Sequence, residues 1–366
     1  MAGQDSLQRE GGRRLDPLAL AWFSLFVLAA IMAGSIALFG NPHAGDPVVA
    51  LDLNSASVSH PPQKHAAPPV PQTPVAPPFN AQQVTVPPPI VPPAIDKAIY
   101  ADHALVADPA LIEQTAQGPL PRIADDGRTP MQAYAPPFPM DNRIRIAVVV
   151  GGLGISARST AQALAELPAG ITLSFAPYSD DVQRWVGEAR RLGHEVLLEV
   201  PMEPYDFPDS DPGAETLRAN TSEDANMNRL VWSLTRFTGY AGVTNLLGGR
   251  FLSNTDSLAP VMAFLSRRGL LFFDNGSAPR SAAPDVAHQI SAPFVQSAVT
   301  LDRIQTAMEV DARLSELETR ARSTGSAAGA AFVYPVTVDR VAQWSKGLGE
   351  RGFVLVPASA LISKPQ

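Results

Sequence analysis

The stretch IRIAVVVGGLG, residues 144–154, indicates the fold class, because an apolar run rich in β-branched residues ends in a glycine-rich turn. A second run of this kind, GHEVLLEVPME, follows at residues 193–203. Further predicted strands lie at 171–175, 241–244, 270–274, 294–299, 331–334 and 354–356, and segments of helical period separate most of them. Strand and helix alternate about seven times, which predicts an α/β fold with a parallel sheet.

Two architectures satisfy this alternation. One is a closed or partly closed (β/α) barrel, and the other is an open doubly wound sheet. In both, the functional residues lie in loops at the carboxyl ends of the strands. The candidate ligand-binding residues are therefore those that follow predicted strands: Gly151, Gly152, Tyr178, Glu203, Asn245, Arg250 and Asn275.

Two acidic residues at the ends of apolar strands are the candidate catalytic groups. Glu199 follows Leu197 and Leu198, and Asp274 follows Phe272 and Phe273. A lone carboxylate in such surroundings is costly unless it faces a polar cavity or has a partner. Each is either a ligand-facing group or one half of a structural ion pair, for Glu199 with an arginine such as Arg250. As an acid/base pair, the two carboxylates could act on a glycan.

Several chemistries are disfavoured by composition. The chain has no Cys, so thiolate metal sites and cysteine nucleophiles are absent. Only His194 and His288 of the six histidines belong to the predicted domain, and a Gly-x-Ser-x-Gly elbow is missing. A net charge of -7 argues against nucleic acid as a partner. The sequence predicts no metal site and no cofactor.

The N-terminal region has the features of a membrane anchor. Residues 17–39 contain no charged residue and are long enough to cross a bilayer core of ~30 Å. Arg9, Arg13 and Arg14 precede this segment, and the next basic residue is Lys64, so residues 1–16 are expected in the cytoplasm. The prediction is a single-pass protein of the inner (cytoplasmic) membrane with its C-terminal domain in the periplasm. A cleavable signal peptide is the alternative, but its apolar region is shorter, about 7 to 15 residues.

A proline-rich segment separates this anchor from the predicted domain. Of the 36 prolines, 22 lie between Asn41 and Met140. Such composition favours polyproline II and predicts a disordered tether over 41–140. Whether the less proline-rich arm at 95–140 packs on the domain stays open, and the domain itself is predicted at 143–363.

The order of motifs resembles the divergent polysaccharide deacetylase family of the glycoside hydrolase/deacetylase superfamily. The motifs are IAVVVGGLG at 146–154, GHEVLLEVPME at 193–203, GVTNLLGG at 242–249 and LFFDN at 271–275. The resemblance implies a distorted (β/α) barrel. It also implies a divalent metal, such as zinc, held by an Asp-Asp pair and two histidines.

This chain departs from that pattern at the metal-site positions. Gly151 and Gly152 stand where the acids are expected, and Glu199 and Leu246 stand where the histidines are expected. The departure from the family pattern therefore implies that metal-dependent deacetylation is absent. The first hypothesis is a deacetylase-like domain that binds envelope polysaccharide or peptidoglycan glycan. The alternatives are a carboxylate-dependent glycan hydrolase, and an interaction module that regulates cell-wall enzymes.

Overall fold

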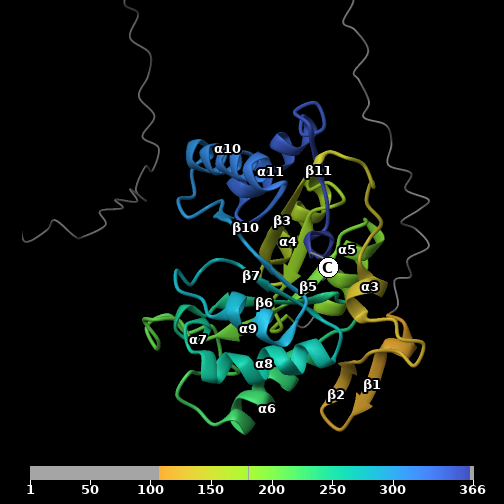
Figure 1. The fold of residues 1–366 in the computed structure, drawn as a ribbon, viewed down its shortest axis with the longest axis vertical. Helices are drawn as coiled ribbons and strands as arrows, with labels where there is room; N and C mark the ends of the chain where they lie inside the picture. The colour runs from red at the N-terminus through yellow and green to blue at the C-terminus, as the bar shows by residue number, and fades with distance from the viewer. Residues whose placement is uncertain (1–106, 180, 363–366) are drawn as a thin grey trace, which may run out of the picture. The chain divides into compact units, whose positions relative to one another are not determined.

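The computed structural model describes residues 107–362 with the exception of residue 180 (Figure 1). The predicted cytoplasmic segment 1–16, the membrane helix 17–39 and the tether up to residue 106 lie outside the described residues. Within 107–362, no helix is both long and apolar enough to cross a membrane.

Nine parallel strands form the central sheet, in the order β8-β7-β6-β5-β4-β3-β10-β9, with β11 also paired to β3. Their bounds are β3 Ile144–Leu153, β4 Thr172–Phe175, β5 Val196–Met202, β6 Gly242–Leu247, β7 Leu271–Asp274, β8 Phe294–Gln296, β9 Val299–Thr300, β10 Ser326–Phe332 and β11 Phe353–Leu355. β8 and β9 are successive in the chain but lie at opposite ends of the sheet order, and no ladder among the described strands joins them. The strands thus form a half-barrel, as the barrel alternative predicted.

Helices lie outside the strands (Figure 1). They are α4 Ala157–Glu166, α5 Val182–Arg191, α6 Glu223–Leu234, α7 Gly249–Leu252, α8 Thr255–Arg267, α9 Ala283–Ile290, α10 Ala307–Thr324 and α11 Pro335–Lys346. The side chains of Ser156 and Ser222 cap α4 and α6, because each accepts a backbone N–H of the first turn.

The two faces of the sheet carry separate hydrophobic clusters. On β5, Val196, Leu198 and Val200 belong to the large cluster that includes the helices, whereas Leu197 belongs to an inner cluster with Val149 and Phe273. This division follows from the period of two in a strand. Odd-numbered residues of β5 therefore point into the half-barrel, and this places Glu199 inside it.

Two strand predictions differ clearly from the observed bounds at the C-terminal half of the domain. The run 294–299 is interrupted, so that β8 and β9 are separate strands. The run 331–334 covers only the end of β10, whose sequence SAAGAAF has little of the β-branched signal that marks a strand. Close packing favours a small residue at one of these positions, because a Cβ on Gly329 would lie 2.9 Å from the side chain of Leu317 in α10.

The arm packs on the domain. It contains η1 Pro109–Leu111, the antiparallel hairpin of β1 Ile112–Thr115 and β2 Gly118–Pro121, and α3 Pro130–Tyr134. Leu111, Leu120 and Tyr134 are buried, and the Tyr134 hydroxyl accepts the backbone N–H of Asp108 at 3.1 Å. Residues 107–134 are thus part of the folded unit. The prolines of η1 and α3 are compatible with this, because each stands at the start of its helix.

Candidate functional site

Glu199 lies on the inner face of β5, near the carboxyl end of the half-barrel. Its side chain is buried, with the residue 3% exposed. Its Oε1 accepts the backbone N–H of Gly152 at 2.5 Å and the hydroxyl of Ser174 at 2.9 Å. Strands β3, β4 and β5 therefore meet at this one carboxyl group.

The two glycines of β3 are kept small by their neighbours. A Cβ on Gly151 would lie 2.5 Å from the Oε1 of Glu199. Gly152 has φ +79°, and a Cβ there would lie 2.1 Å from the ring of Phe332. The Glu199 carboxyl group and the Phe332 ring thus take the space that acidic side chains at 151 and 152 would need. The prediction that these glycines follow the strand was wrong, because both are inside β3.

Burial controls the protonation of Glu199. Loss of hydration raises the pKa of this carboxyl group to about 7, and the hydrogen bonds from Gly152 and Ser174 oppose the rise. No ion pair of Glu199 exists among the described residues, so the pairing with Arg250 was wrong. Arg250 instead lies 3.4 Å from Glu203.

Two buried polar atoms on neighbouring strands have no hydrogen-bond partner among the described residues. They are the Oε2 of Glu199 and the Oγ1 of Thr244. The two residues are paired in register on β5 and β6, and Thr244 is 3% exposed. Paired residues on neighbouring parallel strands project to the same side at a strand spacing of about 4.8 Å. Such atoms are costly to bury without a partner.

The structure does not bring Asp274 to Glu199. Asp274 follows the inward-facing Phe273 on β7, so it points to the outer face. Its Oδ1 accepts the backbone N–H of Gly276 at 2.9 Å, and its Oδ2 accepts the side-chain amide of Gln296 at 3.2 Å. The expected acid/base pair is therefore contradicted by the alternation of β7.

Asn245 and Asn275 are brought together, but they bind one another. The Asn245 Oδ1 accepts the backbone N–H of Asn275 at 3.0 Å, and its Nδ2 donates to the Asn275 Oδ1 at 2.8 Å and to the Leu247 carbonyl at 2.6 Å. These bonds join the end of β6 to the loop after β7. Both amides are used to hold the loops rather than left free for a ligand.

The remaining candidates lie around the same end of the barrel. Glu203 accepts the backbone N–H of Ala219 at 2.7 Å and thereby supports the loop before α6. Tyr178 is 41% exposed, packs its ring 5.6 Å from that of Trp232, and has its pKa raised to about 12 by burial. Tyr178 thus combines a fixed ring with an accessible face.

Three residues of the site were missed by sequence reasoning: Ser174, Thr244 and Phe332. Phe332 is fixed by Asp302, whose Oδ2 accepts the Phe332 N–H at 2.6 Å and the Thr337 hydroxyl at 3.0 Å. Burial raises the pKa of Asp302. A serine and a threonine inside apolar strands were a usable signal, whereas the position of Phe332 depends on the register of β10 with β3.

The residues at this site do not fit the metal that the family pattern implies. At the four expected positions, only Glu199 carries a metal-ligating side chain, and its Oε1 is already engaged. Across residues 107–362 apart from 180, no three His, Asp or Glu side chains are grouped to hold a metal. Zinc requires at least three protein ligands. His194 does not contribute, because its Nδ1 lies 2.9 Å from the Ile171 carbonyl and burial lowers its pKa to about 4.

Comparison with known proteins supports the resemblance. The sequence model of a family described as divergent polysaccharide deacetylase matches residues 148–362. The crystal structure of the uncharacterized protein ATU2773 from Agrobacterium tumefaciens C58 is similar, with 41% identity, a TM-score of 0.66, and coverage of 67% of this chain and 100% of that one. The uncharacterized protein YibQ of Escherichia coli K12 is 28% identical over 223 residues, which are 61% of this chain and 68% of YibQ. An uncharacterized Haemophilus influenzae protein is 20% identical over 194 residues, 53% of this chain and 68% of its own length.

Proposed function

Because the chain belongs to the divergent polysaccharide deacetylase family, we propose that it binds a cell-envelope glycan without metal-dependent deacetylation. The observation that carries this proposal is the Glu199 carboxyl group. It fills the space beside Gly151, and its Oε2 and the Thr244 hydroxyl are buried without a hydrogen-bond partner among the described residues. The old metal-site position is thus converted into a hydrogen-bonding position.

The loss of deacetylation follows from the chemistry of the reaction. Hydrolysis of an acetamide by the family route needs a Lewis acid that polarises the carbonyl and generates hydroxide. A single buried carboxyl group supplies neither function. A group with a pKa of about 7 can, however, accept or donate a hydrogen bond near neutral pH.

The loops at the carboxyl ends of the strands offer a surface for sugar rings. Exposed apolar side chains follow several strands in turn; they are Ile155, Tyr178, Tyr205, Leu247 and Ile304. The Tyr205 hydroxyl is 2.6 Å from the Ser253 hydroxyl, which orients its ring. Aromatic rings can pack against the apolar face of a pyranose, and ligand sites combine such walls with a few polar groups.

A pull-down on purified sacculi and titration with chito-oligosaccharides test this proposal. We expect the purified full chain to bind, and Glu199→Gln to weaken binding because the amide changes the donor and acceptor pattern. Glu195→Gln is the matched control, since Glu195 is also buried on the inner face but near the amino ends of the strands. Absence of binding at millimolar glycan, or equal binding by both variants, would contradict it.

We also propose that residues 17–39 anchor the protein in the inner membrane and that the domain lies in the periplasm. The supporting features are the uncharged apolar run and the arginines before it. Protease added to intact spheroplasts should degrade the domain, and membrane fractions should retain the chain after a high-salt wash. Protection from protease would contradict the orientation.

One observation favours a second candidate, a hydrolase that uses Glu199 alone as general acid. A carboxyl group with a pKa near 7 is protonated often enough to serve as an acid at neutral pH. Release of acetate or reducing ends that Glu199→Gln abolishes would select this candidate.

Retention of envelope proteins by both Glu199→Gln and wild type, without glycan binding, would instead select an interaction module.

A further inference from the structure

A cavity of about 530 Å³ lies between the N-terminal hairpin and the end of α8. It is lined by Glu113, Arg122, Ile123, Phe264, Arg267 and Arg268. Because α8 ends at Arg267 and β7 begins at Leu271, the cavity lies at the amino ends of the strands. It is therefore separate from Glu199 and from the glycan surface, and its size is within the usual range for a small ligand.

The lining is rich in guanidinium groups that are only partly neutralised. Arg268 forms an ion pair with Glu113 at 2.6 Å and donates to the Pro121 carbonyl at 2.9 Å. Arg122 pairs with Asp125, whose side chain is 94% exposed, so this partner lies largely in water. Arg267 has no ion pair among the described residues. Three guanidinium groups and one carboxylate give the lining a formal charge of +2, which Asp125 beside Arg122 reduces to +1.

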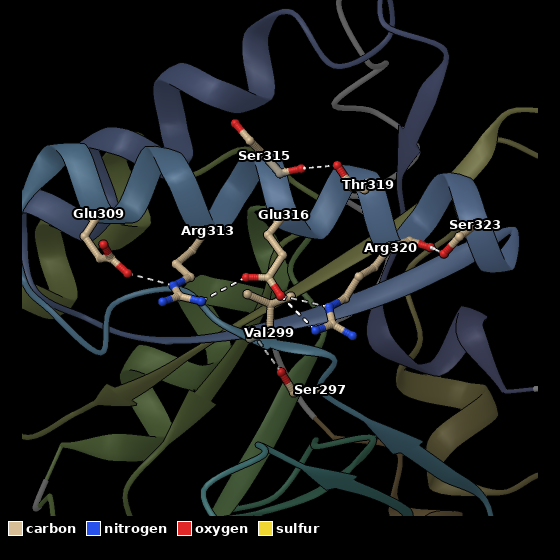
Figure 2. A network of polar contacts seen from close by, with 9 residues as sticks. All are labelled: Ser297, Val299, Glu309, Arg313, Ser315, Glu316, Thr319, Arg320 and Ser323. Atoms are coloured by element: carbon tan, nitrogen blue, oxygen red, sulfur yellow. Dashed lines mark hydrogen bonds and ion pairs between the residues drawn. The ribbon is translucent and has the colours of Figure 1, made fainter.

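The arginines of α10 show a different arrangement in the same protein (Figure 2). Glu309 and Glu316 flank Arg313 at 2.8 and 2.9 Å, and Glu316 also binds Arg320 at 2.8 Å. Each of these two arginines thus has a carboxylate within contact along the helix. In the cavity, by contrast, Arg267 has no ion pair among the described residues, and the carboxylate that pairs with Arg122 is largely exposed, although the whole chain has a net charge of -7.

We propose that this cavity binds a phosphate monoester. Guanidinium groups match the oxygens of phosphate through paired hydrogen bonds. A phosphate monoester carries a charge of about -1.5 to -2 at neutral pH and three acceptor oxygens, so it can accept hydrogen bonds from more than one of these guanidinium groups. Ile123 and the Phe264 ring, 5.1 Å from the Arg268 guanidinium, provide an apolar wall for the organic part of the ligand.

Calorimetric titration of the detergent-solubilised full chain with inorganic phosphate, at constant ionic strength, tests the site. We expect Arg267→Gln to weaken binding at least about tenfold, because a hydrogen bond to a charged group is lost. Arg267 has no ion pair to disturb, so this variant should fold. Arg158→Gln is the matched control, since Arg158 is an exposed arginine at the other end of the strands. The affinity of this variant for inorganic phosphate should equal that of the wild type.

Competition identifies the source of the phosphate. Micelles doped with phosphatidic acid should displace inorganic phosphate if the ligand is a lipid headgroup, and phosphatidylcholine micelles serve as the comparison. Failure of phosphatidic acid to compete would indicate a soluble phosphate ester. No phosphate binding by wild type at about 10 mM, or unchanged affinity in Arg267→Gln, would overturn the proposal, whereas the glycan test at Glu199 is independent of either result.

Discussion

Glu195 and Glu199 are two buried glutamates that project to the same side of the sheet, four positions apart. Glu195 accepts the Thr172 hydroxyl at 3.1 Å, and Glu199 accepts the Ser174 hydroxyl at 2.9 Å, so both contact β4. Burial raises the pKa of both carboxyl groups, and in both the Oε2 lacks a partner. Local chemistry alone does not distinguish them.

The surroundings of Glu195 and Glu199 distinguish the two residues. Glu195 also accepts the backbone N–H of Ser359 at 3.2 Å, and Thr172 accepts that of Ala358 at 3.0 Å. The C-terminal segment thus closes the amino end of the half-barrel over Glu195. Glu199 instead lies beside the unpartnered hydroxyl of Thr244, below loops with exposed apolar side chains. The C-terminal segment therefore holds the buried acid at the amino end, whereas the buried acid at the carboxyl end is the one that we propose takes part in binding.

The largest effect is expected from restoring an acid at the carboxyl end. Gly152→Asp places a Cβ against the Phe332 ring in a left-handed backbone conformation. Overpacking and backbone strain together should lower the free energy of unfolding by about 3 kcal/mol or more. Urea denaturation followed by tryptophan fluorescence measures the change.

Gly127→Asp is the matched control for this substitution. Gly127 has φ +86° but nothing within 4 Å of an added Cβ, so only the backbone cost of about 1 kcal/mol is expected. In a Phe332→Ala background, the loss of unfolding free energy caused by Gly152→Asp should decrease to a similar value. An equal loss in both backgrounds would show that the ring does not exclude the acid.

The pH dependence of stability sharpens the comparison next. Unfolded Glu199 ionises near its ordinary value of 4.5, whereas the folded group holds its proton until about pH 7. The folded state therefore binds more protons in this window, and its stability falls as the pH rises through it, by about 3 kcal/mol in total. Glu199→Gln should remove this part of the decline, measured by urea denaturation between about pH 4.5 and pH 8.

Glu195→Gln provides the companion measurement. It should also reduce the decline, because burial raises the pKa of Glu195, but it should leave glycan binding unchanged. An unaltered pH profile in Glu199→Gln would mean that this carboxyl group is hydrated in solution.

The smallest effect separates two buried threonines. Thr172→Val removes a hydroxyl that bonds both Glu195 and the Ala358 N–H, and should cost about 1–3 kcal/mol. Thr244→Val removes a hydroxyl that has no partner, and should be neutral or slightly stabilising. Denaturation at one pH compares the two variants, and an equal cost would show that Thr244 is bonded as fully as Thr172.

Much of the fold could be predicted from the sequence, because burial leaves a local pattern. The apolar strands, the caps at Ser156 and Ser222, and the positions of candidate loops all follow from neighbours in the chain. The prediction failed at β10, where close helix packing replaces β-branched residues with alanine and glycine. It also failed at Asp274, because one step along a strand reverses the direction of a side chain.

The sequence by itself determined that this chain has alternating strands and helices, and that the four positions where the family resemblance implies metal ligands carry Gly, Gly, Glu and Leu. Only the tertiary structure decided what those changes do. Gly152 and Glu199 are 47 positions apart, and Phe332 comes from a strand near the end of the chain, yet all three meet at one place. The physical reason is that strand register and close packing, which join distant segments, decide which group fills a vacated space.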